Sequence, residues 1–212
     1  MVETETTTAP GTGRAVRPID VAAIMIVLVL GAMFGWYVFR PHPYAGTVLQ
    51  SPTRAPALDG LVFHDGEPAD LSQFDGDLVL LYFGYTNCPD VCPLTLSTAA
   101  RARESLGDDA ERVHVVMVTV DPARDTAEAL GDYVTYFDPG FLGALGPDRD
   151  LRSAAVMYSV YVSVEDTGSE AGYLVEHTAS LMAIDSDGYL RVLYPPEVGV
   201  DALAADLEEL LG

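Results

Sequence analysis

The chain has 212 residues, of which 49% are apolar, and this fits one globular domain behind an N-terminal segment. Asp and Glu together number 32 against 11 basic residues, all of them Arg, so the net charge is −21. This charge argues against binding to nucleic acid or to anionic membrane surfaces. The simplest interpretation of the charge is adaptation to high salt. With only two cysteines, a disulfide-rich scaffold is excluded.

The N-terminal part predicts a membrane anchor behind a disordered tail. Residues 1–18 are rich in Thr, Gly, Pro and Glu, which is typical of disorder. The anchor is expected over residues 19–40, where the run 21–39 contains no charge. As a helix this run spans roughly 28 Å, close to the ~30 Å hydrocarbon core of a bilayer. The alternative is a cleaved signal peptide, whose apolar region is usually shorter.

The basic residues around this run predict its orientation. Arg14 and Arg17 precede the run, and one Arg follows it. Positive charge favours the cytoplasmic side, so we expect a single-pass protein with a cytoplasmic N-terminus and an extracytoplasmic domain. A linker rich in proline is predicted over residues 41–56. The folded domain is predicted over residues 57–212.

The domain predicts an α/β fold, a mixed sheet with helices on both faces. Early strand–helix–strand units give parallel strands, and a late hairpin adds antiparallel strands. The predicted elements, in chain order, are a hairpin near 61–66, a buried strand 78–83, a helix 94–106, a buried strand 113–120, a helix 126–137, a short helix 148–156, a strand 159–164, a hairpin 181–193 and a helix 201–211.

Both cysteines lie in one short loop between a buried strand and a helix. Cys88 and Cys92 are four residues apart, a spacing that brings two side chains together on a helical turn. A helix N-terminus favours the thiolate, which binds soft metals and attacks disulfides. Pro89 and Pro93 stiffen the loop. Metal binding, a redox-active pair and two buried structural thiols are the three readings of this pattern.

Three stretches resemble the SCO/SenC family of copper chaperones. The first is GYTNCPDVCP at residues 84–93, the second is VDPARDT at residues 120–126, and the third is the tripeptide Glu176-His177-Thr178. The first is highly specific, the second supports it and the third is weak alone. Glu176 and Thr178 stand where Asp and Ser are commoner in the family. The resemblance covers roughly residues 56–212.

The resemblance implies a thioredoxin-like fold and one copper site. Carried onto this sequence, the ligands are Cys88, Cys92 and His177. It also implies that the protein delivers copper to the binuclear site of cytochrome c oxidase subunit II, or keeps the cysteines of that site reduced. Two thiolates and an imidazole suit Cu(I), whereas zinc calls for a fourth ligand such as Asp90 or Asp121.

The other polar candidates are assigned structural roles. His42 is expected to be solvated, His64 to be exposed and His114 to belong to the core. Asp121 and Asp125 either support the metal site by hydrogen bonds or serve the N-terminus of the next helix, and the second reading is preferred.

Two alternative functions stay open. A thiol–disulfide oxidoreductase would use Cys88 and Cys92 as a redox pair without a functional metal, although thioredoxins place two residues rather than three between their cysteines. A peroxidase is the weaker alternative. Thr86 lies two residues before Cys88, one residue short of the spacing in peroxiredoxins.

Overall fold

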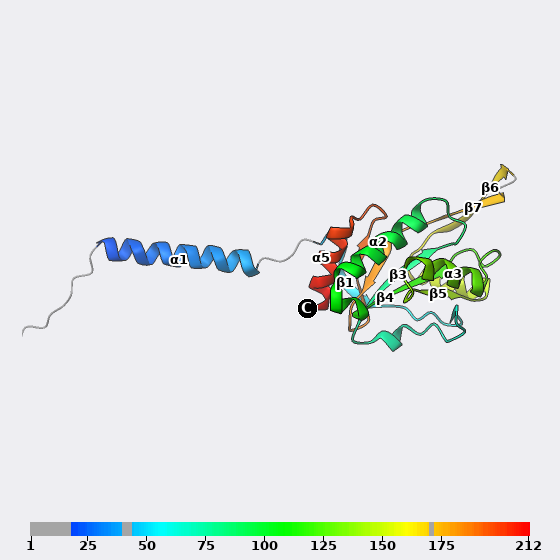
Figure 1. The fold of residues 1–212 in the computed structure, drawn as a ribbon, viewed down its shortest axis with the longest axis horizontal. Helices are drawn as coiled ribbons and strands as arrows, with labels where there is room; N and C mark the ends of the chain where they lie inside the picture. Colours follow the sequence, from blue (N-terminus) through cyan, green and yellow to red (C-terminus); the bar gives the residue numbers. More distant parts are fainter. Residues whose placement is uncertain (1–17, 40–43, 170–171) are drawn as a thin grey trace, which may run out of the picture. The chain divides into compact units, whose positions relative to one another are not determined.

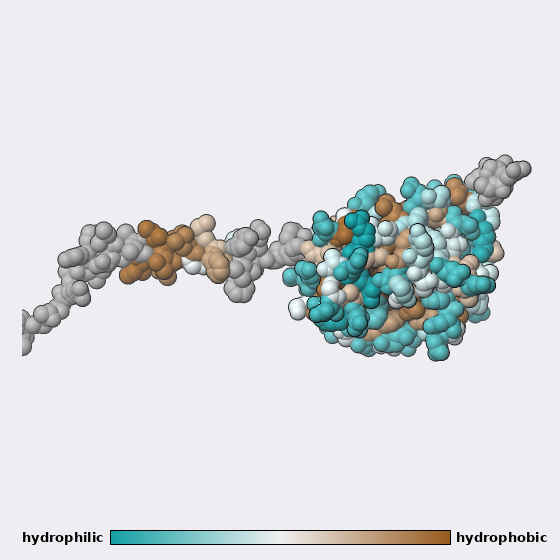
Figure 2. Space-filling model, viewed as in Figure 1, coloured by the Kyte–Doolittle hydropathy of each residue, from teal (hydrophilic) through white to brown (hydrophobic). Residues whose placement is uncertain are grey.

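The computed structural model describes residues 18–39, 44–169 and 172–212 (Figure 1). The chain falls into two units, Met1–His42 and Pro43–Gly212. The described part of the first unit is one helix, α1 (Pro18–Phe39), whose described side chains are mostly hydrophobic (Figure 2). Among the described residues, no helix has the length and apolarity needed to cross a membrane. The predicted disordered tail lies almost entirely outside the described residues.

The second unit is an α/β domain whose helices and strands alternate along most of the chain. Its elements are β1 (Thr47–Arg54), β2 (Val62–Phe63), η1 (Leu71–Phe74), β3 (Leu78–Gly84), α2 (Val91–Ser105), η2 (Gly107–Arg112), β4 (Val113–Thr119), α3 (Ala127–Phe137), β5 (Leu142–Leu145), α4 (Asp148–Met157), β6 (Val162–Ser169), β7 (Gly172–His177), β8 (Leu181–Ile184), β9 (Tyr189–Tyr194) and α5 (Val200–Leu211).

Seven strands form one mixed sheet in the order β1-β9-β8-β3-β4-β5-β2. The central strands β3, β4 and β5 are parallel, and the strands outside them pair antiparallel. β6 and β7 form a separate two-stranded antiparallel sheet. The predicted mixed sheet is confirmed. Because β3 is central and covered on both faces, all seven of its residues are buried.

Two cores cover the two faces of the large sheet, because successive side chains of a strand point to opposite faces. Leu80 and Tyr82 of β3 face the core that includes α2, α3 and α5. Leu81 and Phe83 face the core that includes α4. Both layers pack on β3, so the loop that follows β3 begins at a strand buried on its two faces.

The predicted linker over residues 41–56 needs correction, because residues 47–54 form the edge strand β1. β1 pairs with β9, and its register shifts between Val48 and Thr53, where Pro52 interrupts the pattern. A proline fits an edge strand at such an irregularity, since no ladder hydrogen bond is lost there. Most β1 residues are exposed or half-buried, so the strand lacks the apolar run that would predict it.

The strands at the other edge of the sheet also differ from the prediction. Val62 and Phe63 start the predicted hairpin turn, with an isolated bridge to Pro68. Their main partner is β5, which the sequence analysis did not predict. β5 has only four residues and contains Gly143, where an added Cβ would lie 2.5 Å from the Leu130 side chain. The glycine lets α3 pack closely on the strand, and it hides the strand pattern.

Candidate metal centre

The loop between β3 and α2 positions both cysteines. Cys88 lies in the loop and is half-buried, whereas Cys92 is the second residue of α2 and is fully buried. Both thiols are free. Gly84, at the end of β3, lies against Cys92: a Cβ there would be 3.0 Å from Cys92 Sγ and 2.6 Å from the Tyr82 ring. Only glycine leaves room for the second thiol.

His177 reaches the cysteines from a remote part of the chain. It is the last residue of β7 and pairs with Val162 of β6. Its Nδ1 lies 3.3 Å from the Thr178 carbonyl oxygen, and its Nε2 lies 3.4 Å from Cys92 Sγ. The ring therefore turns Nε2, one of its two possible ligand atoms, toward the sulfurs.

The ligand atoms of Cys88, Cys92 and His177 lie within 4.8 Å of one another. Around a three-coordinate ion, metal–sulfur and metal–nitrogen bonds of about 2.3 and 2.0 Å hold the ligand atoms roughly 4 Å apart. The triad therefore fits one ion after a shift of less than about 1 Å. Among the described residues, no carboxylate joins this group. The soft three-ligand set matches Cu(I) better than zinc.

The two thiols differ in protonation. The hydrogen bond from the Cys92 thiol lowers the pKa of Cys88 to about 3, and contacts with His177 and the amides of Asp90 and Cys92 act in the same direction. The same shared hydrogen bond, together with burial, raises the pKa of Cys92. The thiolate, the form that binds a soft metal or attacks a disulfide, is therefore favoured at the more exposed sulfur.

Two tyrosines that the sequence analysis did not select complete the centre. Tyr82 donates a hydrogen bond to Cys92 Sγ over 3.4 Å, and burial raises the pKa of its phenol, which keeps it a donor. The rings of Tyr82 and Tyr85 meet the His177 ring edge-on, at 6.0 and 5.9 Å between centroids. In the sequence, Tyr82 could be noticed only as a residue with a hydroxyl group inside an otherwise apolar strand.

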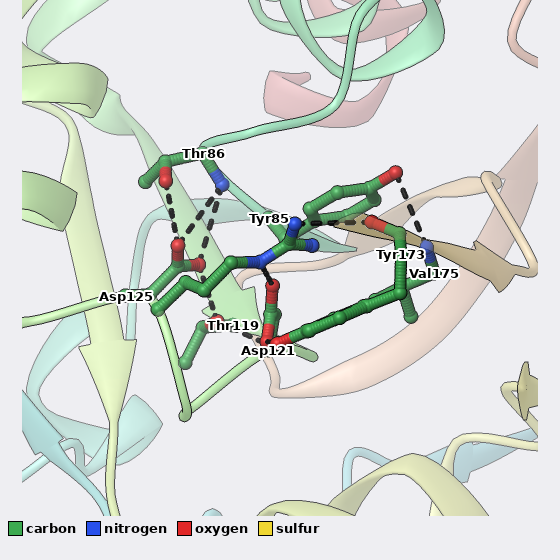
Figure 3. Close-up of polar contacts among 8 residues, drawn as sticks. Tyr85, Thr86, Thr119, Asp121, Asp125, Tyr173 and Val175 are labelled. Atoms are coloured by element: carbon green, nitrogen blue, oxygen red, sulfur yellow. Dashed lines mark hydrogen bonds and ion pairs between the residues drawn. The ribbon is translucent and has the colours of Figure 1, made fainter. Parts of the chain in front are cut away.

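Asp125 holds the cysteine loop to the neighbouring strand (Figure 3). It accepts hydrogen bonds from the hydroxyl groups of Thr86 and Thr119, each over 2.6 Å, and from the Thr86 amide over 3.3 Å. Burial raises the pKa of Asp125, although these hydrogen bonds oppose the shift. Thr126, not Asp125, caps α3. The preferred reading of Asp125 as a helix-terminus residue is therefore wrong.

Asp121 and Arg124 hold the histidine-bearing hairpin in a similar way (Figure 3). Asp121 accepts a hydrogen bond from the Tyr173 hydroxyl over 2.7 Å and pairs with Arg124. Arg124 donates to the Tyr173 carbonyl oxygen over 3.0 Å, and its guanidinium lies 3.8 Å from the centre of the Tyr173 ring. The Val175 amide lies 3.4 Å from the Tyr85 hydroxyl. β7 is thus tied to the elements that carry the cysteines.

The remaining sequence candidates lie apart from the centre. His42 is outside the described residues. His64 is half-buried, not exposed, because its Nδ1 accepts a hydrogen bond from the Gly143 amide over 3.1 Å. His114 is only partly covered: it contacts Asp77 over 3.0 Å and stacks on Phe74. Asp90 is exposed and is not part of the metal-ligating group.

Comparison with known proteins gives a consistent result. The sequence pattern of the SCO1/SenC family matches residues 60–212. An SCO2-like protein of Rickettsia conorii is 32% identical over 63% of this chain and 66% of its own length. The mitochondrial SCO2 homologue of Mus musculus is 35% identical over 63% of this chain and 53% of its own length. The chain therefore matches less than two thirds of the length of these relatives.

Solved structures share the fold of the domain. Apo Sco1 from Thermus thermophilus is 38% identical and superposes with a TM-score of 0.70, covering 81% of this chain and 99% of its own. Copper-bound ScoI from Bradyrhizobium japonicum is 29% identical, with a TM-score of 0.65, covering 76% of this chain and 98% of its own. The predicted thioredoxin-like fold is confirmed by this likeness to Sco proteins.

Proposed function

Because the chain belongs to the SCO1/SenC family, we propose that it is a copper chaperone that holds a single Cu(I) through Cys88, Cys92 and His177. The observation that carries the proposal is the convergence of these three ligand atoms within 4.8 Å. The copper-bound ScoI structure of Bradyrhizobium japonicum supports copper as the metal. The lowered pKa of Cys88 favours the thiolate, which is the form that binds a soft cation.

An anaerobic Cu(I) titration of the reduced full chain tests this site. We expect one copper per chain, and we expect His177→Ala to weaken binding by at least about tenfold because it removes one of three ligands. His114→Ala is the matched control, since His114 is bonded to Asp77 away from the thiols. Equal copper affinity in the two variants would disprove the assignment of His177.

The proposed recipient is the binuclear copper site of cytochrome c oxidase subunit II, by membership of the family. Delivery predicts that copper passes from the loaded chain to a purified subunit II fragment with reduced cysteines. Reduction of the recipient predicts instead that an oxidised fragment gains two thiols while Cys88 and Cys92 form a disulfide. The two reactions are separated by mass spectrometry of both proteins after mixing.

A thiol–disulfide oxidoreductase is the second candidate function. The observation in its favour is the asymmetric thiol pair, with a half-buried Cys88 of lowered pKa beside a buried Cys92. This function needs no imidazole ligand, so disulfide reduction would survive His177→Ala. A loss of reductase activity in that variant, in parallel with copper binding, would favour the chaperone instead.

The proposal includes a membrane anchor over residues 21–39, with the N-terminus in the cytoplasm and the domain on the other side. It is supported by the uncharged run and by Arg14 and Arg17 before it. We expect the chain to resist alkaline extraction of membranes, whereas Leu28→Arg, at a cost of roughly 2.5–3.5 kcal/mol, is released in part. Recovery of the unaltered chain in the soluble fraction would contradict the anchor.

A further inference from the structure

An open cavity of about 510 Å³ lies directly over the metal centre. Cys88 and His177 line it, together with Tyr85. The cysteine loop forms one wall and the β6–β7 hairpin the other, so the cavity is bounded by two elements remote in sequence. Any molecule that exchanges metal with the centre through this opening must contact both walls.

The two walls are apolar where they face the cavity. Pro89 and Val91 contribute on the side of the cysteine loop, and Tyr161 and Leu174 on the side of the hairpin. Tyr161 is 63% exposed and Leu174 is 42% exposed, and both lie beside the metal centre on the same cavity. Large apolar side chains held open to water beside a reactive centre are typical of a docking surface.

Carboxylates surround these apolar walls. Asp90, Glu165 and Glu176 are exposed and line the same cavity, and none of its described lining residues is Arg or Lys. A second copy of this chain, with a net charge of −21, would be repelled from it. The complementary occupant carries apolar groups next to positive charge.

We infer that this cavity docks the metal-accepting protein through a segment in which apolar side chains stand next to Lys or Arg. The inference rests on the proposed function, since it names the surface by which a recipient reaches the centre. Tyr161 and Leu174 supply the apolar contact, and Glu165 selects a basic segment. Tyr161, Leu174 and Glu165 are not among the three proposed metal ligands.

The test uses the isotope-labelled full chain, reduced and metal-free in mild detergent, titrated in NMR with short synthetic peptides. The probe peptide contains Leu, Phe and two Arg and has no metal ligand. In one control peptide Glu replaces both Arg, and in another Ser replaces Leu and Phe. We expect the probe to bind at least about fivefold more tightly than either control and to shift signals of the cavity.

Substitutions in the chain locate the binding. Tyr161→Ser with Leu174→Ser is expected to weaken probe binding by about tenfold. Raising the salt from about 0.1 to 1 M should weaken probe binding to the unaltered chain. We expect the same change in salt to weaken binding less in Glu165→Gln, which has lost one negative charge. Tyr136→Ser is the matched control, because Tyr136 is 84% exposed and lies outside this cavity. Its binding should equal that of the unaltered chain.

Three results would overturn the inference: no saturable binding, equal binding of the three peptides, or equal effects of the control and the cavity variants. NMR signals of the cavity that shift with the concentration of the chain, and not with that of the peptide, would also overturn it. They would indicate that the cavity binds a second copy of the chain. Copper titration of the Tyr161→Ser, Leu174→Ser variant keeps the two proposals apart. Normal copper binding with unchanged peptide binding refutes the docking surface alone.

Discussion

Replacing Asp125 removes the acceptor that joins the cysteine loop to β4. Asp125 is only 3% exposed and receives three donors, the hydroxyl groups of Thr86 and Thr119 and the Thr86 amide. Each buried donor left without a partner costs about 1–3 kcal/mol, and removal of a buried charge returns part of that cost. We therefore expect Asp125→Ala to lower the free energy of unfolding by about 2–4 kcal/mol.

Asp125→Asn separates the hydrogen bonds from the charge. The amide oxygen still accepts from one threonine, and the other hydroxyl can turn to accept from the amide nitrogen. We expect a loss of about 1 kcal/mol for this variant. Urea denaturation of the reduced chain measures both changes. Asp132→Ala, at an exposed position on α3, is the control and should stay within about 0.5 kcal/mol of the unaltered chain.

The raised pKa of Asp125 gives this comparison a pH dependence. A carboxyl whose folded-state pKa lies above its unfolded value of about 3.9 contributes stability below the unfolded value and loses it as pH rises through the folded value. The stability advantage of the unaltered chain over Asp125→Asn should therefore grow as pH falls from about 7 toward about 4. A flat difference, or Asp125→Ala as stable as the control, would refute the reasoning.

Three further predictions concern the centre and its supports. Gly84→Ala places a Cβ 3.0 Å from Cys92 Sγ, so we expect weaker copper binding in a Cu(I) titration; unchanged affinity would contradict the close approach. Iodoacetamide should modify Cys88 before Cys92, because Cys88 is more exposed and has the lower pKa, as peptide mass spectrometry would show. Tyr173→Phe removes a 2.7 Å hydrogen bond worth about 1 kcal/mol and should speed hydrogen exchange in β7; unchanged exchange would argue against this tie.

The sequence was sufficient for the strands β3 and β4 and for the three residues that meet at the candidate metal centre. Leu78–Gly84 is an uninterrupted apolar strand, and its burial on both faces follows directly from that pattern. Cys88 and Cys92 stand out because both cysteines share one loop. His177 was selected through family resemblance, since local spacing cannot relate it to residues 85 positions earlier.

Local sequence patterns could not predict the hydrogen bonds that hold the elements of the metal centre together. Asp125 was interpreted as a residue of the helix N-terminus because its neighbours in sequence begin a helix, yet its partner Thr86 is 39 positions away. The Tyr173 hydroxyl of β7 meets Asp121, which lies 52 positions earlier in the chain. Similarly, β1 is an edge strand whose residues contain a proline and lack an apolar run. It forms by pairing with β9, a strand far away in the sequence. These misses are long-range contacts that short-range propensity does not encode.

X-ray absorption at the copper edge of the loaded full chain identifies the atoms bound to copper. We expect two sulfur neighbours and one imidazole nitrogen, with the imidazole signal lost in His177→Ala and kept in His114→Ala. A copper environment without imidazole in the unaltered chain, or one that the His177 substitution leaves unchanged, would contradict the proposed ligand set.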